Sequence, residues 1–368
     1  MPEKVLTQLD LNRTTLARQM LLERHSLSVP AAVERLVGLQ AQMPSAPYVG
    51  LWTRIRSFAR TDLAGQIEAR IIVKATTIRG TLHLVTAEDF LRFRSCLQPM
   101  LSAGWSDIAG RKGAAFDLNQ ILEAGKAYIG EEPRKFSDVS DHLLELFPDY
   151  DVGAMRYGVR THLPLVQVPT STTWSYPGNP EFALAESWLG KPVTDGEDLP
   201  ALLLRYLEAF GPASVTDMQT WSGMPKLKEM VEQMKPNLQV YKDENRRELY
   251  DAPGLELTSP DVPVPLRFLP EYDNLLLSHS NRTRVISNDH RSKVYLPGLR
   301  VRATFLVDGF VRGAWSTEKK KGAAVLTVEP FEPVTNSQKD QLVEEGERLI
   351  RFVEEDAKSW EVRFQETA

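Results

Sequence analysis

Thr76-Thr77-Ile78-Arg79-Gly80-Thr81-Leu82-His83-Leu84-Val85 is the stretch of sequence that decides the fold class. Apolar and β-branched residues flank the Arg79-Gly80 pair on both sides, a pattern typical of two paired β-strands joined by a turn. The sequence therefore predicts a short β-hairpin with strands over residues 76–78 and 81–85.

The residues before this hairpin have helical spacing instead. Asn12 is expected to cap a first helix. Ser28 is expected to cap a second, with Pro30 in its first turn, where the missing N–H does no harm. Residues 48–58 and 62–70 are predicted to form two more helices. The hairpin thus closes a helical unit.

The same order of helices and then a hairpin occurs twice more. The second unit has predicted helices over 118–129, 137–147 and 152–162 and strands over 165–168 and 173–176. The third unit has predicted helices over 199–210, 215–221 and 225–234 and strands over 238–241 and 248–251. Segments rich in proline and glycine separate these units.

The last hundred residues follow a different pattern. Strand-like runs are predicted over residues 274–277, 283–286, 294–296, 301–307, 310–315 and 324–328. A charged amphipathic helix over residues 337–356 follows them. This part of the chain is predicted to be a β-rich domain with a terminal helix.

A three-helix unit with a two-stranded wing is the winged form of the helix-turn-helix, in which a helix and the wing meet a DNA duplex. We therefore expect an α+β protein with three tandem winged-helix motifs, over residues 1–110, 111–190 and 191–258, followed by the β-rich domain over residues 259–368. Helical subdomains with incidental hairpins are the alternative interpretation, and the pattern alone does not separate the two.

Charge is distributed unevenly along the chain. The net charge of −5 over 368 residues argues, taken alone, against a nucleic-acid partner. Residues 282–321, however, contain ten lysines and arginines and only three acidic residues. Local positive patches, rather than total charge, attract a phosphate backbone. This stretch is a candidate DNA-binding surface, although a solvated face is the simpler interpretation of any run of charges.

Several classes of protein are excluded by what the sequence lacks. The single cysteine, Cys96, has no partner for an intramolecular disulfide. No apolar run approaches the ~18 residues of a membrane span, and residues 1–20 lack the apolar segment of a secretory signal. We expect a cytoplasmic protein that has no membrane contact and that associates with the nucleoid through DNA.

The usual catalytic and cofactor motifs are also absent. The sequence has no Walker A loop, no GxGxxG after a strand, no HExxH, no CxxC and no GxSxG elbow. Its six histidines show no metal-ligand spacing. We expect neither a metal nor a cofactor.

Two glutamines near the end of the second helix do not fit a purely structural role. Gln40 has helical spacing from Val33 and Leu36, and a buried amide there needs partners. A proline shortly afterwards predicts that the helix ends near Ala41. In an extended segment residues i and i+2 face the same way, so Gln40 and Gln42 would converge on one small molecule such as water. A solvated helix end remains the simpler interpretation.

The chain resembles a known family over nearly its whole length. The stretches that carry the resemblance are Leu39-Gln40-Ala41-Gln42, Ala46-Pro47-Tyr48, Leu51-Trp52-Thr53-Arg54, Arg79-Gly80-Thr81-Leu82-His83-Leu84, Arg160-Thr161-His162-Leu163-Pro164-Leu165-Val166, Phe268-Leu269-Pro270-Glu271-Tyr272-Asp273-Asn274, Asn281-Arg282-Thr283-Arg284 and Val307-Asp308-Gly309-Phe310. In this order they are similar to the winged-helix alkylpurine DNA glycosylases of the AlkZ type.

The resemblance implies a C-shaped molecule and monofunctional hydrolysis of the N-glycosidic bond of N7-alkylated purines in DNA, with N3-alkylated purines as a further class. Bulky adducts and interstrand cross-links are included among the implied substrates, in base-excision repair or in self-resistance to a genotoxin. The family's catalytic signature is Gln, an apolar residue, then Gln or Asp. Gln40 and Gln42 match it and are the expected catalytic residues.

Further residues are expected to surround this motif or to contact DNA. His83 and Tyr48 are candidates to line its pocket. Residues 286–293 are predicted to form a strand–turn–strand hairpin that probes a DNA groove. The expected DNA contacts are Arg156, Arg160, Lys226, Lys228, Arg282, Arg284, His290, Arg291 and Lys293.

A non-catalytic winged-helix transcriptional regulator is the main alternative, and a scaffold for protein partners is a third. A regulator binds a defined operator, usually as a two-fold dimer on spaced half-sites. Three winged units in one chain already supply a large interface. We therefore expect a monomer whose partner is double-stranded DNA that carries alkylated purines.

Overall fold

The computed structural model describes residues 5–113, 116–196 and 198–365, and it is a mixed α+β structure. The predicted first hairpin is present with Arg79-Gly80 in its turn, but its first strand lies over residues 72–76 instead of 76–78, because Ile78 belongs to the turn. The elements of this first part are β1 (Val5–Leu6), α1 (Gln8–Arg18), α2 (Val29–Arg35), β2 (Leu39–Gln40), α3 (Ala46–Trp52), α4 (Arg60–Glu68), β3 (Ile72–Thr76), the 3₁₀ turn η1 (Ile78–Gly80), β4 (Leu82–Thr86), α5 (Ala87–Phe93), η2 (Ser95–Leu97) and α6 (Gln98–Arg111).

The middle of the chain contains the two other helical groups, each with a strand pair. The first has α7 (Leu118–Glu131), β5 (Arg134–Lys135), α8 (Phe136–Leu146), α9 (Val152–His162), β6 (Leu165–Gln167), β7 (Glu181–Leu184) and α10 (Ala185–Leu189). The second has α11 (Leu199–Phe210), α12 (Val215–Ser222), α13 (Lys228–Met234), η3 (Lys235–Asn237), β8 (Gln239–Asp243) and β9 (Glu248–Asp251). The predicted helices of both groups are present to within a few residues.

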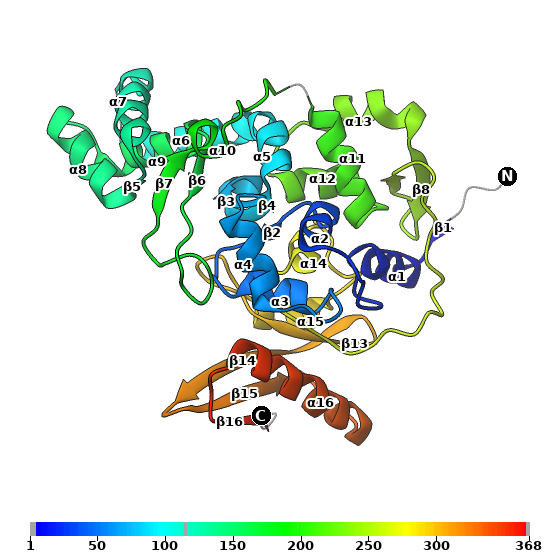
Figure 1. Cartoon of the computed structure of the whole chain (residues 1–368). Helices are drawn as coiled ribbons and strands as arrows, with labels where there is room; N and C mark the ends of the chain where they lie inside the picture. Colours follow the sequence, from blue (N-terminus) through cyan, green and yellow to red (C-terminus); the bar gives the residue numbers. More distant parts are fainter. Residues whose placement is uncertain (1–4, 114–115, 197, 366–368) are drawn as a thin grey trace.

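The C-terminal part is rich in strands and ends in one long helix and a last strand. Its elements are β10 (Arg267–Leu269), α14 (Asn274–Leu277), α15 (Asn288–Val294), β11 (Tyr295–Leu296), β12 (Arg300–Val301), β13 (Thr304–Val307), β14 (Phe310–Lys320), β15 (Ala323–Pro330), α16 (Asn336–Val353) and β16 (Ser359–Phe364). In Figure 1, α16 lies against β14, β15 and β16 at the lower end of the molecule, while α7 and α8 lie at the upper left.

Sheet pairing crosses the boundaries between the sequence units. One six-stranded sheet has the order β2-β4-β3-β6-β7-β5, so the first two hairpins share it and meet where Ala75 pairs with Val166. The third hairpin, β8–β9, is extended by β1 from the start of the chain, in parallel with β8. A five-stranded sheet, β10-β13-β14-β15-β16, is formed within the C-terminal part.

Four other predictions of strands are wrong. Residues 173–176 are not a strand, because β6 pairs instead with residues 181–184. Residues 274–277 form helix α14, and residues 283–286 form no strand. Residues 286–293 are not a hairpin, because residues 288–294 form helix α15. The error at residues 274–277 arose because a short apolar run does not separate strand from helix.

Asn12 does not cap the first helix. Thr7 is the N-cap, and its hydroxyl and the Asp10 carboxylate complete a capping box. Asn12 is buried inside α1, and its amide donates hydrogen bonds to the carbonyl oxygens of Arg284 and Gly309. The polar side chain therefore joins distant segments instead of capping a helix. The prediction that Ser28 caps the second helix, with Pro30 in its first turn, is confirmed.

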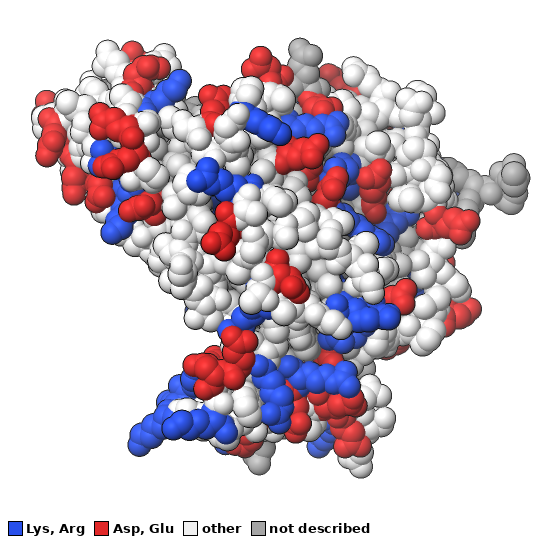
Figure 2. Space-filling view, in the orientation of Figure 1, with Lys and Arg blue, Asp and Glu red and all other residues white. Residues whose placement is uncertain are grey.

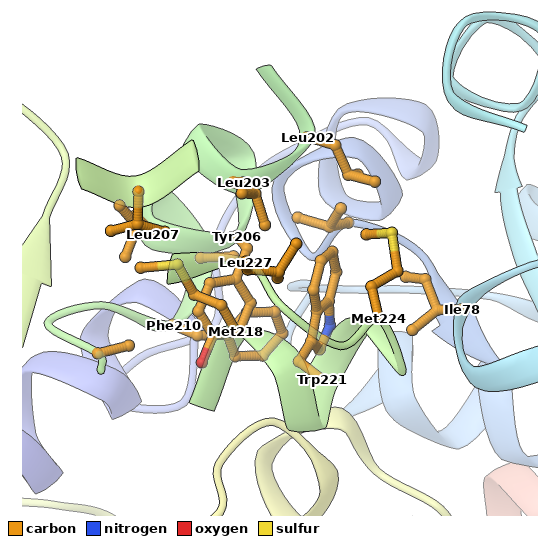
Figure 3. Packing of buried hydrophobic residues seen from close by; sticks show 14 of the residues in the cluster. Ile78, Leu202, Leu203, Tyr206, Leu207, Phe210, Met218, Trp221, Met224 and Leu227 are labelled. Atoms are coloured by element: carbon orange, nitrogen blue, oxygen red, sulfur yellow. The ribbon is translucent and has the colours of Figure 1, made fainter. Parts of the chain in front are cut away.

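The largest apolar cluster places a residue of the first hairpin inside the third helical group. Ile78, from the turn of that hairpin, is buried together with residues of α11 and α12. Figure 3 shows Trp221 between Ile78 and Met224 on one side and Tyr206 on the other. This packing fixes the hairpin turn against α12. None of the helices in the described residues is long and apolar enough to cross a membrane.

Candidate active site

The segment that carries Gln40 and Gln42 leaves the second helix earlier than predicted. Helix α2 ends at Arg35 rather than near Ala41. Val37 and Gly38 follow with φ angles of 54° and 88°, and Gly38 could not be replaced easily because a Cβ there would lie 2.8 Å from a methyl group of Val85. Leu39 and Gln40 then form strand β2. Gln40 is therefore in extended backbone and not at a solvated helix end.

Strand β2 is held at the edge of the six-stranded sheet by β4. Gln40 is paired with His83, Leu39 with Leu84, and the Ala41 N–H donates to the Leu82 carbonyl at 2.7 Å. Residues directly opposite each other in an antiparallel pair point to the same face. The side chains of Gln40 and His83 therefore share one face of the sheet.

The two glutamine side chains have different surroundings. Gln40 is 7% exposed, and its Oε1 accepts a hydrogen bond of 2.8 Å from Nη2 of Arg79. Gln42 is exposed, and its Oε1 accepts only a long bond, 3.4 Å, from the Leu82 N–H. Gln40 is thus fixed in one orientation, whereas Gln42 is free to meet solvent or a substrate.

The ionisable groups beside Gln40 keep one charge state around neutral pH. Burial, with a smaller contribution from the nearby Arg79 charge, lowers the pKa of His83 to about 3. His83 is therefore neutral, and its Nδ1 donates to the Thr81 carbonyl at 3.1 Å. Burial, and after it the charge of Arg282, lowers the pKa of Arg79 to about 10, so Arg79 remains a cation. Neither group changes its charge near pH 7.

The turn before β2 is clamped from the C-terminal part of the chain. The Asn274 amide donates to the carbonyl oxygens of Leu36, at 3.2 Å, and Gly38, at 2.6 Å. Next to it, Asp273 accepts two hydrogen bonds, 2.9 and 2.8 Å, from the guanidinium of Arg54. Both side chains of this ion pair are almost completely buried. Residues far away in the sequence therefore set the position of the glutamine segment.

Sequence reasoning assigned no role to Arg79, Asn274 or the Arg54–Asp273 pair. The signal that could have found Asp273 and Asn274 is a pair of polar residues between the apolar end of β10 and the apolar run Leu275–Leu277. That signal does not say which distant backbone the side chains contact, because such contacts depend on the tertiary fold.

Tyr48 lies on the other side of β2 from Gln40. It is buried in the apolar cluster that also contains Leu39 and Ala41, the residues that alternate with Gln40 along the strand. Its hydroxyl shares a hydrogen bond of 2.6 Å with Ser175, and its ring meets Trp174 edge-on. Tyr48 therefore supports the segment from behind and does not line a pocket with the Gln40 amide.

Two of the expected DNA contacts are buried. Arg284 is 6% exposed, and its Nη1 donates to Thr15 and to the carbonyl of Pro212. His290 is 8% exposed, and its Nδ1 lies 3.3 Å from the carbonyl of Val311. These side chains join segments of the protein and are not presented to a phosphate.

The other candidate cations are on the surface to different extents. Those that are exposed lie on α9, at or just before the start of α13, and on α15; they are Arg156, Lys226, Lys228, Arg291 and Lys293. Arg160 and Arg282 are half-buried. The guanidinium of Arg282 lies 4.2 Å from the centre of the Tyr295 ring.

Acidic neighbours neutralise part of the basic stretch over residues 282–321. Arg302 pairs with Glu329, Arg312 with Glu332, Lys319 with Asp356 and Lys320 with Glu318. Figure 2 shows lysines and arginines gathered at the free end of β14 and β15, and acidic residues over α7 and α8. The charge counted along the sequence is therefore larger than the charge left unpaired.

One exposed hairpin stands out beside α15. Strands β11 and β12 pair between Tyr295 and Val301, and the turn between them carries Leu299, which is 91% exposed. Residues 297–299 form this turn, between Leu296 at the end of β11 and Arg300 at the start of β12. Over the described ranges, no group of three or more His, Cys, Asp or Glu side chains is arranged to hold a metal ion.

The fold and site define a class of protein: a mixed α+β chain with two neutral amides two residues apart and with exposed cations on α9, on α15 and around the start of α13. Residues 33–352 match the model of the AlkZ-like DNA glycosylase family. Because this match covers most of the chain, the protein belongs to the AlkZ-like family and is a DNA glycosylase.

A protein sequence and a solved structure, both from Streptomyces sahachiroi, are similar to this chain. One is described as an interstrand DNA cross-link repair glycosylase and is 25% identical over 345 residues, which are 85% of this chain and 88% of that protein. The other is the solved structure of the S. sahachiroi DNA glycosylase AlkZ, which superposes with a TM-score of 0.79 at 20% identity and covers 98% of this chain and 100% of that one. At that identity the structural match supports the fold alone.

Proposed function

We propose that this glycosylase hydrolyses the N-glycosidic bond of N7-alkylated purines in duplex DNA, including bulky adducts and interstrand cross-links, and that Gln40 and Gln42 hold the attacking water. The observation that carries the proposal is the segment that begins with strand β2, which presents a fixed amide at Gln40 and an exposed one two residues later, at Gln42. The cross-link repair name of the Streptomyces relative supports the inclusion of cross-links.

Neutral amides are sufficient for this chemistry. An N7-alkylated purine is already cationic, so its glycosidic bond is weak and the base leaves as a neutral molecule. The enzyme has to hold a water in line with the anomeric carbon while positive charge develops on the sugar. An amide can accept from that water through its oxygen and donate elsewhere through its nitrogen. An amide cannot form a Schiff base with the sugar, so the reaction is monofunctional.

We propose that the three helical groups are winged-helix motifs, over residues 1–110, 111–190 and 191–258, and that residues 259–368 form the C-terminal domain of a C-shaped molecule. The arrangement in Figure 1, with α7 and α8 at one end and β14–β16 at the other, supports this proposal. The protein is then a monomer that partly encloses its duplex and works on DNA in the cytoplasm or nucleoid, in base-excision repair or self-resistance.

The proposed DNA contacts are the cations that reach the surface. They are Arg156, Arg160, Lys226, Lys228, Arg282, Arg291 and Lys293, without the buried Arg284 and His290. The groove probe is reassigned from residues 286–293, which include a helix, to the β11–β12 hairpin with exposed Leu299 at its turn. An exposed apolar side chain at the turn of a hairpin can wedge between base steps.

The alternative of a non-catalytic transcriptional regulator is disfavoured, since the chain belongs to a family of glycosylases. The test is to incubate the protein with a duplex that carries one 7-methylguanine and to measure the free base by mass spectrometry. Release of 7-methylguanine with an abasic site in the DNA is expected. Sequence-specific binding of unmodified duplex without release would overturn the enzymatic proposal.

A second substrate tests how the lesion is reached. Enzymes that flip the base into a closed pocket limit the size of the adduct. The exposed position of Gln42 supports an open site, in which the damaged base is released while it is still stacked in the duplex. We expect excision of a large intercalating N7-guanine adduct in the same duplex context as 7-methylguanine. Efficient release of the small lesion with none of the large one would exclude the open site.

A further inference from the structure

Arg79 occupies a strained and densely packed position next to the proposed catalytic segment. It lies in the 3₁₀ turn η1 between β3 and β4 with a φ angle of 56°, in the left-handed region that arginine seldom adopts. Such conformations persist only where the surroundings hold them in place, and they are concentrated at functional sites.

Two independent contacts fix the guanidinium of Arg79. Nη2 donates to Oε1 of Gln40 at 2.8 Å, and Nη1 donates to the carbonyl of Trp221, in α12, at 2.7 Å. Gly223 lies directly against it, since a Cβ there would be 3.2 Å from the Arg79 Cα. Figure 3 shows the preceding residue, Ile78, in the same apolar cluster as Trp221. The third helical group thus anchors Arg79, whose other hydrogen bond is to Gln40 in the first group.

The left-handed backbone of Arg79 and the partial burial of its charge cost stability, and no ion pair with a described residue offsets this cost. Among the described residues, no carboxylate forms a salt bridge with it, and the nearby charged group is another cation, Arg282. Arg79 is half-buried, and a charge that is partly withdrawn from water without a counter-charge is normally unfavourable. Its hydrogen-bonded partners are instead one backbone carbonyl and the amide of Gln40. The contact with Gln40 is therefore a candidate reason for its presence.

The contact also settles which way the Gln40 amide points. A guanidinium has only donors, so the oxygen of the amide must face it and the nitrogen must face away. With its oxygen engaged by Arg79, Gln40 can act on a substrate mainly as a donor through Nε2. Gln42 differs, because its oxygen has only the long 3.4 Å bond from Leu82. Its lone pairs remain available to a water molecule.

We infer that Arg79 is a positioning residue, which orients the Gln40 amide so that Gln40 donates to the reacting DNA while Gln42 accepts from the attacking water. This inference rests on the proposed function and narrows it, since Gln42 alone then accepts from the water and Gln40 holds the DNA beside it. Polarisation by the guanidinium also strengthens the N–H of the same amide as a donor. The loss of Arg79 then leaves DNA binding in place but lets the amide turn.

The chain contains a matched control at Arg94. This buried arginine also donates to a glutamine oxygen, Oε1 of Gln98 at 2.9 Å, and to a backbone carbonyl, that of Thr161 at 2.6 Å. Arg94 is not in contact with the Gln40 segment in any of these bonds. Arg79→Met and Arg94→Met therefore remove the same kinds of bond, but only the first touches the proposed chemistry.

The experiment is a double-mutant cycle on single-turnover release of 7-methylguanine, with affinity for unmodified duplex and the urea midpoint measured in parallel. Arg79→Met is expected to slow excision by about 10- to 100-fold, the usual effect of a misplaced catalytic group. In the Gln40→Ala background the same change is expected to add nothing, because residues that act as a unit are non-additive. Arg94→Met is expected to stay within about twofold of the parent.

The outcomes separate this inference from the proposed function. Three outcomes would overturn the role of Arg79 alone. The effects of Arg79→Met and Gln40→Ala could multiply independently, or Arg79→Met could excise at the parental rate. The third outcome is a loss of activity in Arg94→Met equal to that in Arg79→Met. A Gln40→Ala enzyme at the parental rate would overturn the proposed role of Gln40 as well. These results differ in which single variant retains activity.

Gln40→Glu tests the orientation without disturbing Arg79, and it covers the case in which Arg79→Met does not fold. A glutamate keeps an acceptor for the guanidinium but has no Nε2 donor. We expect excision as slow as in Gln40→Ala, with a urea midpoint at or above the parental one because Arg79 gains a counter-charge. Parental excision by Gln40→Glu would show that donation is not needed and would overturn the inference.

Discussion

The glutamine segment over residues 36–42 and the basic stretch over residues 282–321 were both singled out as functional, yet the protein treats their polar groups in opposite ways. Along the glutamine segment, distant side chains hold the backbone and one amide, through Asn274 and Arg79. Along the basic stretch, burial and acidic neighbours remove charges from the surface, as at Arg284 and Arg302.

The difference shows what a motif and a charge count can each predict. A motif such as Gln40-Ala41-Gln42 depends on a few atoms held in place, and here other segments hold them. A charge count predicts a surface only if each charge reaches solvent without a partner. In residues 282–321, Arg291 and Lys293 are exposed and form no ion pair with a described carboxylate, whereas Lys319 and Lys320 are exposed but paired with carboxylates.

The largest effect is expected from the exposed amide of the glutamine segment. Gln42→Ala should lower single-turnover excision of 7-methylguanine by about 10²–10⁴-fold, the cost of losing a positioned catalytic group. Affinity for the duplex should change little, because Gln42 is neutral. Gln120→Ala, at an exposed glutamine on α7, is the control and should behave as the parent. Parental excision by Gln42→Ala would remove the motif from the mechanism.

A somewhat smaller effect is expected on stability from the ion pair behind the segment. Asp273→Asn keeps the shape of the side chain but leaves the buried Arg54 without its counter-charge. Breaking such a pair from one side costs about 3–5 kcal/mol in the free energy of unfolding, as measured by urea denaturation. Asp356→Asn, at an exposed pair with Lys319, should leave the urea midpoint nearly unchanged. Equal losses of unfolding free energy in both variants would show that burial of the Arg54–Asp273 pair makes no difference.

A modest effect is expected from the exposed cations of the basic stretch. Arg291→Ala with Lys293→Ala should weaken binding to every duplex and reduce the slope of log affinity against log salt by up to about 0.9 for each phosphate that is no longer neutralised. Lys320→Ala, at a lysine already paired with Glu318, should leave the slope unchanged. If the slope responds to Lys320 and not to Arg291 and Lys293, the DNA lies along β14–β15 instead.

No effect is expected when pH is varied around neutrality. The pKa of His83 is lowered to about 3 by burial, and that of Arg79 to about 10, so neither group titrates between about pH 5 and about pH 9. The single-turnover rate should be flat over this range. The unfolded chain takes up a proton on His83 below its ordinary pKa of 6.5, so stability falls toward acid, and fluorescence must confirm folding. A rate that changes steeply near pH 6.5 would indicate a titrating histidine.

The sequence was sufficient for much of the fold wherever local interactions decide the structure. Most helices lie where their apolar periodicity predicted, and Ser28 caps α2 as expected. The first hairpin follows from the turn at Arg79-Gly80. Errors arose where one pattern suits two structures: the short apolar run over residues 274–277 is a helix, and the partner of β6 is residues 181–184 rather than residues 173–176.

By itself, the sequence determined the order of helices and hairpins, the Gln40-Ala41-Gln42 motif and the resemblance to a glycosylase family, because each of these is written in neighbouring residues. Only the tertiary structure decided that β1 pairs with β8, that Arg284 is buried, and that Arg79 turns the oxygen of Gln40 away from solvent. The physical reason is that burial and hydrogen-bond partners depend on segments far apart in the chain, whose meeting no local pattern encodes.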